Sequence, residues 1–283
     1  MDNYFLKPKP YPSMAESWGI TGLMVLSMLV FSPLFIGLRL ILDEGLSFLL
    51  YYIFVFSIPL LLFKAKRKKR NGDASFNFAI GNLRIAALVI LCTTSMLFAI
   101  TTPLVSLIPM PEVFREIFEG MHYSGIFSHV AIVVAAPLLE ELIMRGIVLD
   151  GLLKRYDPVK SILLSSFLFG ILHLNPWQFI SAFVIGIFAG WVYWKTKRIS
   201  LAILIHMTNN LMALLISLTN KDTPTLDGSF LDTYGGSFYA VMIIVVGLIT
   251  FAGCIYLLKK EFLKEKVKVP DEVNITPAAK FWE

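Results

Sequence analysis

The chain has 283 residues, of which 57% are hydrophobic and only 16% charged, and its mean hydropathy is +0.72. This balance excludes an ordinary soluble domain, and repeated apolar runs of 18 residues or more indicate a protein that crosses the bilayer several times. The net charge of +5 does not indicate nucleic-acid binding, because the basic residues cluster at the ends of apolar segments, as cytoplasmic anchors do. Cys92 and Cys254 lie inside apolar segments, so no disulfide framework is expected.

Taken in chain order, the apolar runs predict an all-α, polytopic membrane protein with about eight transmembrane helices. The first run is too long for a signal peptide and lacks a small-residue cleavage site, so we expect an uncleaved N-terminus. Residues 1–18 are expected to be a cytoplasmic tail, residues 19–258 one membrane domain, and residues 259–283 a second cytoplasmic tail. The predicted spans are 19–42, 46–63, 86–108, 125–153, 159–174, 177–194, 199–218 and 237–258.

The fifth span and the connection between the third and fourth spans each have an unusual feature. The fifth span is short for a hydrocarbon core of about 30 Å, and Asn175-Pro176 ends it abruptly, because the residue before a proline disfavours the helical conformation. A short helix of this kind is tolerated where it borders a protein-lined cavity. Residues 109–121, between the third and fourth spans, are predicted to form a small amphipathic helix in the membrane interface.

The distribution of basic residues predicts that both termini are cytoplasmic. If the N-terminus is inside and the loops alternate, the outer side receives only Arg39, Arg115 and Lys221 of the 25 Lys and Arg residues, while Arg145 stays within the membrane. This asymmetry satisfies the positive-inside rule. We therefore expect an integral, multi-pass protein of a bacterial cytoplasmic membrane, whose surroundings are the lipid bilayer.

A small set of polar side chains lies deep within the predicted spans. Placing an ionised side chain near the bilayer centre costs about 2.5–3.5 kcal/mol of insertion free energy even on lenient scales. Such residues are therefore expected to be paired with one another and to have a function. Arg39 and Asp150 lie near span ends, from which they are expected to reach the headgroups. His122 and His129, near the outer interface, are interpreted as interhelical hydrogen-bonding residues. The deep set comes from the fourth, fifth and seventh spans: Glu140, Glu141, Arg145, His173, His206 and Asn210.

Helical spacing suggests roles for these side chains. Glu141 and Arg145 are four residues apart with the acid first, which is the favourable order for an ion pair. Glu140 points about 100° away and faces a different neighbour. His206 and Asn210 are also four residues apart, and an imidazole beside an amide donor can stabilise an oxyanion.

A proline precedes the glutamates. Pro137 cannot donate to the carbonyl of Val133, so the fourth span is expected to kink one turn before Glu140 and Glu141.

Two other classes of function also fit buried polar residues. A proton-coupled transporter would carry buried carboxylates and histidines, although no repeated halves with matching broken helices are visible in the sequence. A non-catalytic immunity or scaffold protein would keep the same residues only for folding. Proton-gradient-dependent uptake distinguishes the first alternative, and indifference to replacement of Glu140 distinguishes the second.

The polar residues form three motifs in a fixed order. Glu140-Glu141-Leu-Ile-Met-Arg145 reads EExxxR, Phe169-Gly-Ile-Leu-His173 reads FxxxH, and His206 is followed four residues later by Asn210. With these motifs, residues 120–218 resemble the CPBP family of intramembrane proteases. That family includes CAAX prenyl endopeptidases and bacterial proteins linked to bacteriocin processing or self-immunity.

The resemblance implies peptide-bond hydrolysis of a membrane-bound peptide or lipidated protein. Carried over residue by residue, Glu140 and His173 activate a water, His206 and Asn210 stabilise the tetrahedral oxyanion, and Glu141 and Arg145 shape the site. The family has been regarded both as metalloproteases and as metal-free glutamate-dependent proteases. If zinc is bound, its ligands would be Glu140, His173 and His206. Direct activation of water by Glu140 is slightly favoured, and the sequence identifies neither the substrate nor an oligomeric state.

Overall fold

A computed structural model describes residues 9–114, 116, 125–219 and 234–268, and the regular structure of this part of the chain is entirely helical. The elements are α1 (Met14–Val30), α2 (Ser32–Leu38), α3 (Glu44–Asn71), α4 (Leu83–Met96), η1 (Leu97–Thr101), α5 (Thr102–Val105), α7 (Ile126–Val130), η2 (Ala131–Ala135), α8 (Ala136–Ile143), η3 (Met144–Leu149), α9 (Asp150–Leu153), α10 (Pro158–Ile171), α11 (Pro176–Thr196), α12 (Ile199–Thr219) and α14 (Ser237–Lys268). The three η elements are π-helical.

The fold is that of a polytopic membrane protein, as predicted. Within the described residues, six helical stretches are long and apolar enough to cross a membrane: Met14–Leu38, Glu44–Asn71, Leu83–Val105, Pro176–Thr196, Ile199–Leu218 and Ser237–Glu265. The predicted fifth span is the shorter apolar helix α10. The predicted fourth span is a succession of short α and π segments from α7 to α9. Residue 115 and residues 117–121 of the predicted interface helix at 109–121 lie outside the described residues, as does His122.

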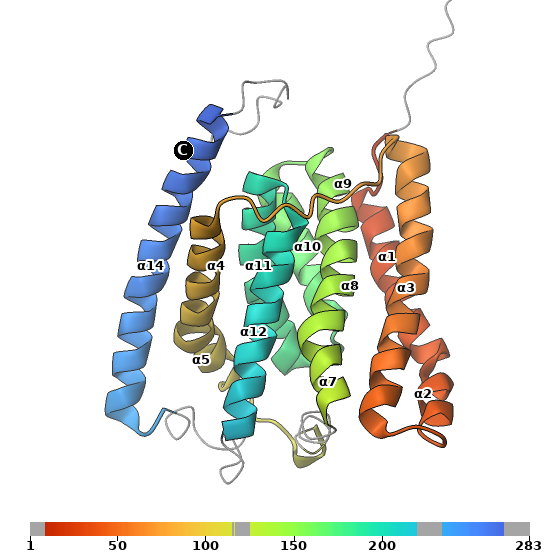
Figure 1. The fold of residues 1–283 in the computed structure, drawn as a ribbon, viewed down its shortest axis with the longest axis horizontal. Coiled ribbons are helices and arrows are strands. Elements are labelled where there is room, and N and C mark those ends of the chain that lie inside the picture. The colour runs from red at the N-terminus through yellow and green to blue at the C-terminus, as the bar shows by residue number, and fades with distance from the viewer. Residues whose placement is uncertain (1–8, 115, 117–124, 220–233, 269–283) are drawn as a thin grey trace, which may run out of the picture.

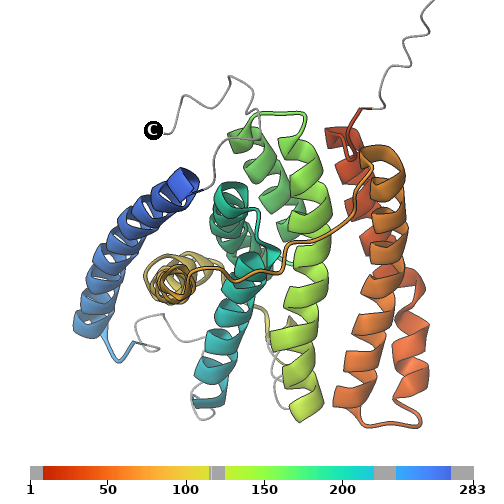
Figure 2. The same ribbon diagram turned by 45° about the horizontal axis from the view of Figure 1, so that its top comes forward.

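The helices lie side by side, with α8 and α12 near the centre (Figure 1). On one side α3 packs against α1, α7 and α8, and on the other α4 packs against α12 and α14. α10 and α11 pack against each other. Figure 2 shows α4 nearly end-on between α12 and α14, so α4 runs obliquely to α12. The segment that carries the glutamates is therefore covered by helices on several sides.

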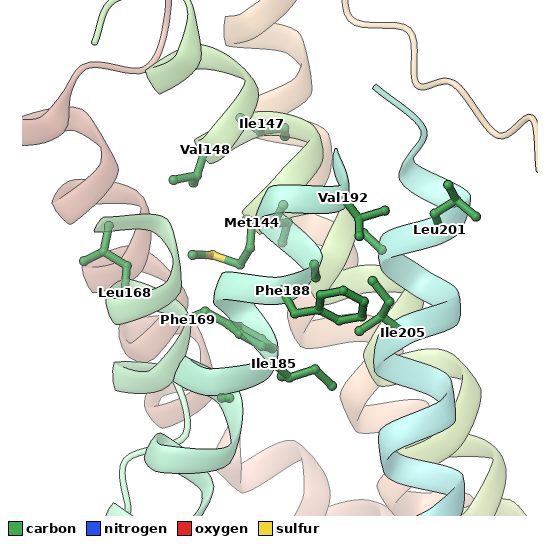
Figure 3. Close-up of a cluster of buried hydrophobic side chains, with 14 of the residues drawn as sticks. Met144, Ile147, Val148, Leu168, Phe169, Ile185, Phe188, Val192, Leu201 and Ile205 are labelled. Atoms are coloured by element: carbon green, nitrogen blue, oxygen red, sulfur yellow. The ribbon is translucent and has the colours of Figure 1, made fainter. Parts of the chain in front are cut away.

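Apolar packing fixes the relative positions of the motif-bearing helices. Figure 3 shows Met144, Ile147 and Val148 of η3 close to Leu168 and Phe169 of α10, with side chains of α11 and α12 completing the cluster. Met144, Ile147, Leu168 and Phe169 are fully buried. Because close-packed interiors resist small displacements, this cluster holds α8, η3, α10 and α12, and the polar residues on or next to them, at fixed separations.

A π-helical segment precedes Pro137, where the sequence predicts a kink; the kink itself stays a prediction. Pro137 occupies the first turn of α8, and η2 immediately precedes that helix. A second π segment, η3, begins directly after Ile143. Glu140 and Glu141 thus lie on a short α-helical stretch between two π segments. Such π-helical turns widen the helix and occur frequently at functional sites.

Asp150 does not reach the headgroups, and that expectation from its position near a span end is wrong. Its side chain is buried at 6% exposure, where it pairs with Arg67 Nη2 at 3.2 Å and with Lys154 Nζ at 2.7 Å. Tyr193 also donates to it, at 3.3 Å. A buried carboxylate needs such partners, and α3 supplies the arginine from a distant part of the sequence. Arg39, in contrast, is half-exposed and pairs with Glu44 at 3.5 Å.

Candidate active site

Glu141 is the acceptor at the centre of a buried ion-pair network. Arg145 Nη1 donates to Glu141 Oε1 at 2.8 Å, and these side chains are 0% and 1% exposed. His206 Nδ1, from α12, lies 3.1 Å from the same oxygen. The predicted pairing of Glu141 with Arg145 is confirmed. Two cationic or proton-bearing groups on one oxygen fix the position of the carboxylate and link α8, η3 and α12.

Glu140 faces a different set of neighbours, as its position on the helix predicts. The Tyr52 hydroxyl, on α3, donates to Glu140 Oε1. Glu140 Oε2 lies 3.9 Å from His206 Nε2. The imidazole of His206 therefore stands between the two glutamates, with one ring nitrogen toward each.

His173 follows the end of α10 in a turn, and the ring of Phe169 connects it to the other site residues. The ring centroid of Phe169 lies 5.1 Å from that of His173 and 5.3 Å from that of His206, both edge-to-face. The guanidinium of Arg145 lies 4.5 Å from the centroid of the same ring. His173 Nδ1 is 3.0 Å from the Phe169 carbonyl oxygen, which leaves its Nε2 as the nitrogen available for chemistry. His173 is also within electrostatic reach of Glu140.

Asn210 lies one turn beyond His206, but its amide is partly committed elsewhere. Asn210 Nδ2 donates to the Ile132 carbonyl in η2 at 2.9 Å, and its Oδ1 accepts from Asn209 Nδ2 at 3.1 Å. An amide nitrogen carries two hydrogens, so one donor of Asn210 is still available. The carbonyl that Asn210 binds belongs to the π-helical turn before Pro137, which ties the third motif to the segment that carries the first.

Several buried polar atoms of the site have no hydrogen-bond partner within the described part of the chain. They are Glu140 Oε2, Glu141 Oε2, Arg145 Nε and Arg145 Nη2. Because most buried polar atoms are hydrogen-bonded, such a concentration calls for a functional explanation. The Glu140 carboxylate oxygen near the His206 imidazole can accept a proton from water and return it, which is general acid–base chemistry.

The side chains do not form a metal centre in this arrangement. Among the residues that the structure describes, which include Glu140, His173 and His206, no three His, Cys, Asp or Glu side chains are grouped so that they could hold a metal ion. A three-ligand zinc site needs donors at about 2.0–2.2 Å from a common point. The site as it stands does not fit zinc.

Two further residues contribute to the site, although nothing in the sequence indicated their roles. Tyr52 lies in an apolar helix 88 residues before Glu140. Gly186 of α11 lies where an added Cβ would be 2.9 Å from Ser166 Cβ and 3.1 Å from Arg145 Nη2. The absence of a side chain at this position lets α11 cover the guanidinium.

We expect Gly186→Ala to lower the stability of the folded protein by about 1–3 kcal/mol, because a methyl group at this position overpacks the core against α10 and Arg145. Thermal unfolding of the purified protein in detergent measures the effect. Gly22→Ala is the matched control, since a Cβ on that exposed helical glycine meets nothing within 4 Å. The control should be neutral or slightly stabilising, and equal behaviour of both variants would contradict the packing argument.

Comparison with known families agrees with this geometry. Residues 123–212 match the family described as type II CAAX prenyl endopeptidase, Rce1-like. The matched segment contains all three motifs and ends just after Asn210. No curated protein and no solved structure matches the chain.

Proposed function

We propose, from the match of residues 123–212 to the family of Rce1-like type II CAAX prenyl endopeptidases, that the chain hydrolyses a peptide bond of a membrane-associated substrate within the bilayer. The observation that carries the proposal is the convergence of Glu140, Glu141, Arg145 and His206 on one another in a buried site. His173 adjoins them across the Phe169 ring.

In the proposed mechanism Glu140 is the general base. Its Oε2, which has no hydrogen-bond partner among the described residues and lies 3.9 Å from His206 Nε2, accepts a proton from a water that His173 helps to orient. The resulting hydroxide attacks the scissile carbonyl carbon and forms a tetrahedral oxyanion. Glu140 then gives the proton to the leaving amine as the peptide bond breaks. A positioned acid–base group of this kind contributes about 10²–10⁴-fold.

The oxyanion is proposed to be stabilised by His206 and the remaining amide hydrogen of Asn210. Because the Nδ1 proton of His206 is donated to Glu141, His206 can donate to the oxyanion only if Nε2 also carries a proton. The ring is then a positively charged imidazolium, and the neighbouring Glu141 carboxylate balances its charge, as the carboxylate of a catalytic triad does. Arg145 in turn holds Glu141 in place.

We further propose eight membrane crossings with both termini cytoplasmic. The C-terminal ends of α3 and α14 and the N-terminal end of α10 lie at one end of the bundle (Figure 1). The basic residues of Lys64–Arg70 belong to the C-terminal part of α3, at this same end. The proposed membrane domain then corresponds to residues 19–258. Two helices extend beyond these limits: α1 begins at Met14, and α14 continues to Lys268.

The substrate class is tested with a peptide that ends in a farnesylated CAAX sequence and its unprenylated counterpart. The purified protein is reconstituted into liposomes, and the products are identified by mass spectrometry. Cleavage on the carboxyl side of the farnesylated cysteine supports a prenylated substrate, and cleavage of neither peptide would contradict it. Proton-gradient-driven uptake of a solute by the same vesicles, without cleavage, would favour a transporter instead.

Direct activation of water by Glu140 predicts that cleavage survives metal removal. We expect activity after dialysis against a strong chelator to stay within about twofold of the untreated protein, because no catalytic step is assigned to a metal. Elemental analysis of the purified protein accompanies the assay. Loss of activity on chelation, with recovery on adding zinc, would overturn the metal-free mechanism and implicate Glu140, His173 and His206 as ligands.

A further inference from the structure

Tyr52 reaches the site from a helix outside the family-matched segment. It lies on α3, whose residues 44–71 precede the matched residues 123–212 by a wide margin. Its hydroxyl nevertheless donates to Glu140 Oε1. α3 packs along α8, which brings this hydroxyl against the first glutamate of the EExxxR motif.

The direction of the Tyr52 hydroxyl is fixed by aromatic packing along α3. Its ring is stacked on Phe56, with centroids 4.4 Å apart and an interplanar angle of 8°. On the other side it meets Phe48 edge-to-face at 5.8 Å. These neighbours lie one helical turn before and after Tyr52, and Phe56 is buried. A side chain held on both sides presents its hydroxyl without a large loss of rotamer entropy.

The hydrogen bond makes the two oxygens of Glu140 unequal. Oε1 accepts from the phenol, while Oε2 has no hydrogen-bond partner among the described residues and lies 3.9 Å from His206 Nε2. Without the phenol the carboxylate could rotate about its terminal torsion, which is a broad and nearly two-fold one. The neighbouring Glu141 needs no such help, because Arg145 and His206 already hold it.

We propose that Tyr52 is a positioning residue that holds Glu140 so that Oε2 faces the water and the scissile carbonyl. This inference rests on the proposed function for its kinetic consequence, but the contact itself does not depend on it. The phenol acts through Glu140 and is not assigned a contact with substrate. Positioning of a reacting group to within a fraction of an ångström is a recognised source of rate.

The first test compares Tyr52→Phe with Tyr51→Phe, in full-length protein reconstituted into liposomes with the farnesylated CAAX peptide. Each substitution removes one hydroxyl from α3 and keeps the ring, but Tyr51 donates to the Met28 carbonyl at 2.8 Å, away from the site. We expect Tyr52→Phe to lower kcat by about 10- to 100-fold, as removal of a hydrogen bond to a charged group does. KM should stay unchanged, and Tyr51→Phe should resemble the wild type in both.

An unchanged kcat in Tyr52→Phe would overturn the proposal. So would a joint change of kcat, KM and Tm larger than that of Tyr51→Phe, since that pattern indicates a purely structural role. If the wild type cleaves and Glu140→Gln does not, while Tyr52→Phe is fully active, the positioning role fails and the proposed function stands.

A second test needs no substrate. Glu140 is labelled with a membrane-soluble carbodiimide, and the rate of modification is followed by mass spectrometry of the purified protein. We expect severalfold faster labelling of Glu140 in Tyr52→Phe than in the wild type or Tyr51→Phe, because loss of the phenol's hydrogen bond leaves the carboxylate more nucleophilic and free to rotate. Equal rates in all three proteins would overturn the contact, even if the wild type cleaves no test peptide.

Discussion

Replacement of Glu140 by glutamine should reduce kcat for peptide cleavage by about 10²–10⁴-fold, the loss typical of removing a general base. Glutamine has nearly the same shape and still accepts from the Tyr52 hydroxyl, so the site should keep its packing. An amide oxygen, however, cannot take a proton from water. Single-turnover cleavage in liposomes separates this chemical step from substrate binding and product release.

The matched control for this prediction is Glu44→Gln, which makes the same chemical change at a half-exposed position of α3 that pairs with Arg39. Both variants should insert into the membrane and unfold at temperatures close to the wild type. The control should retain wild-type kcat. Substantial cleavage by pure, folded Glu140→Gln protein would remove Glu140 from the mechanism.

Arg145→Met should produce the largest loss of stability among the single substitutions considered, about 3–5 kcal/mol, because it leaves the Glu141 carboxylate buried without its cation. Arg145 is 0% exposed and Glu141 1%, so water cannot replace the lost partner at the surface. The substitution also removes the guanidinium from the face of the Phe169 ring. Thermal unfolding in detergent micelles, compared with the wild type, measures the loss.

A second substitution distinguishes an uncompensated charge from lost packing. The double variant Glu141→Gln/Arg145→Met removes both charges of the pair, and we expect it to recover a large part of the stability lost in Arg145→Met. Neutral replacements of a whole buried pair are commonly tolerated far better than removal of one partner. A double variant no more stable than the single one would show that packing around Arg145, rather than charge, dominates.

The course of the chain through the membrane was largely predictable because apolar runs and their boundaries are local properties. Each predicted span corresponds to helical structure in the described residues. The Asp157-Pro158 and Asn175-Pro176 pairs begin α10 and α11, with both cap side chains accepting from the first turn. The pairing of Glu141 with Arg145 was predictable for the same reason, since it depends only on spacing within one helix.

The contacts between distant helices could not be predicted in this way. Nothing in the spacing of Tyr51 and Tyr52 indicates which hydroxyl faces Glu140, because that depends on how α3 is rotated against α8. Asp150 illustrates the same limit: its position near a span end indicated the headgroups, while Arg67 on α3 holds it in a buried ion pair.

The role of Phe169 also appeared only in three dimensions. In the sequence it is one apolar residue among many, distinguished only by its spacing from His173. In the structure its ring adjoins His173, His206 and Arg145. An aromatic ring can order several polar groups through its edge and face at once, and no one-dimensional pattern encodes which groups those are.

The most direct measurement is a comparison of membrane peptidomes from cells that carry this chain at its own locus, either unchanged or as Glu140→Gln. Cells with the unchanged chain should contain membrane-associated polypeptides with new carboxyl termini, and the matching uncleaved forms should accumulate in the Glu140→Gln cells. Indistinguishable sets of termini in the two membranes, with both proteins present at equal levels, would contradict hydrolysis by this site.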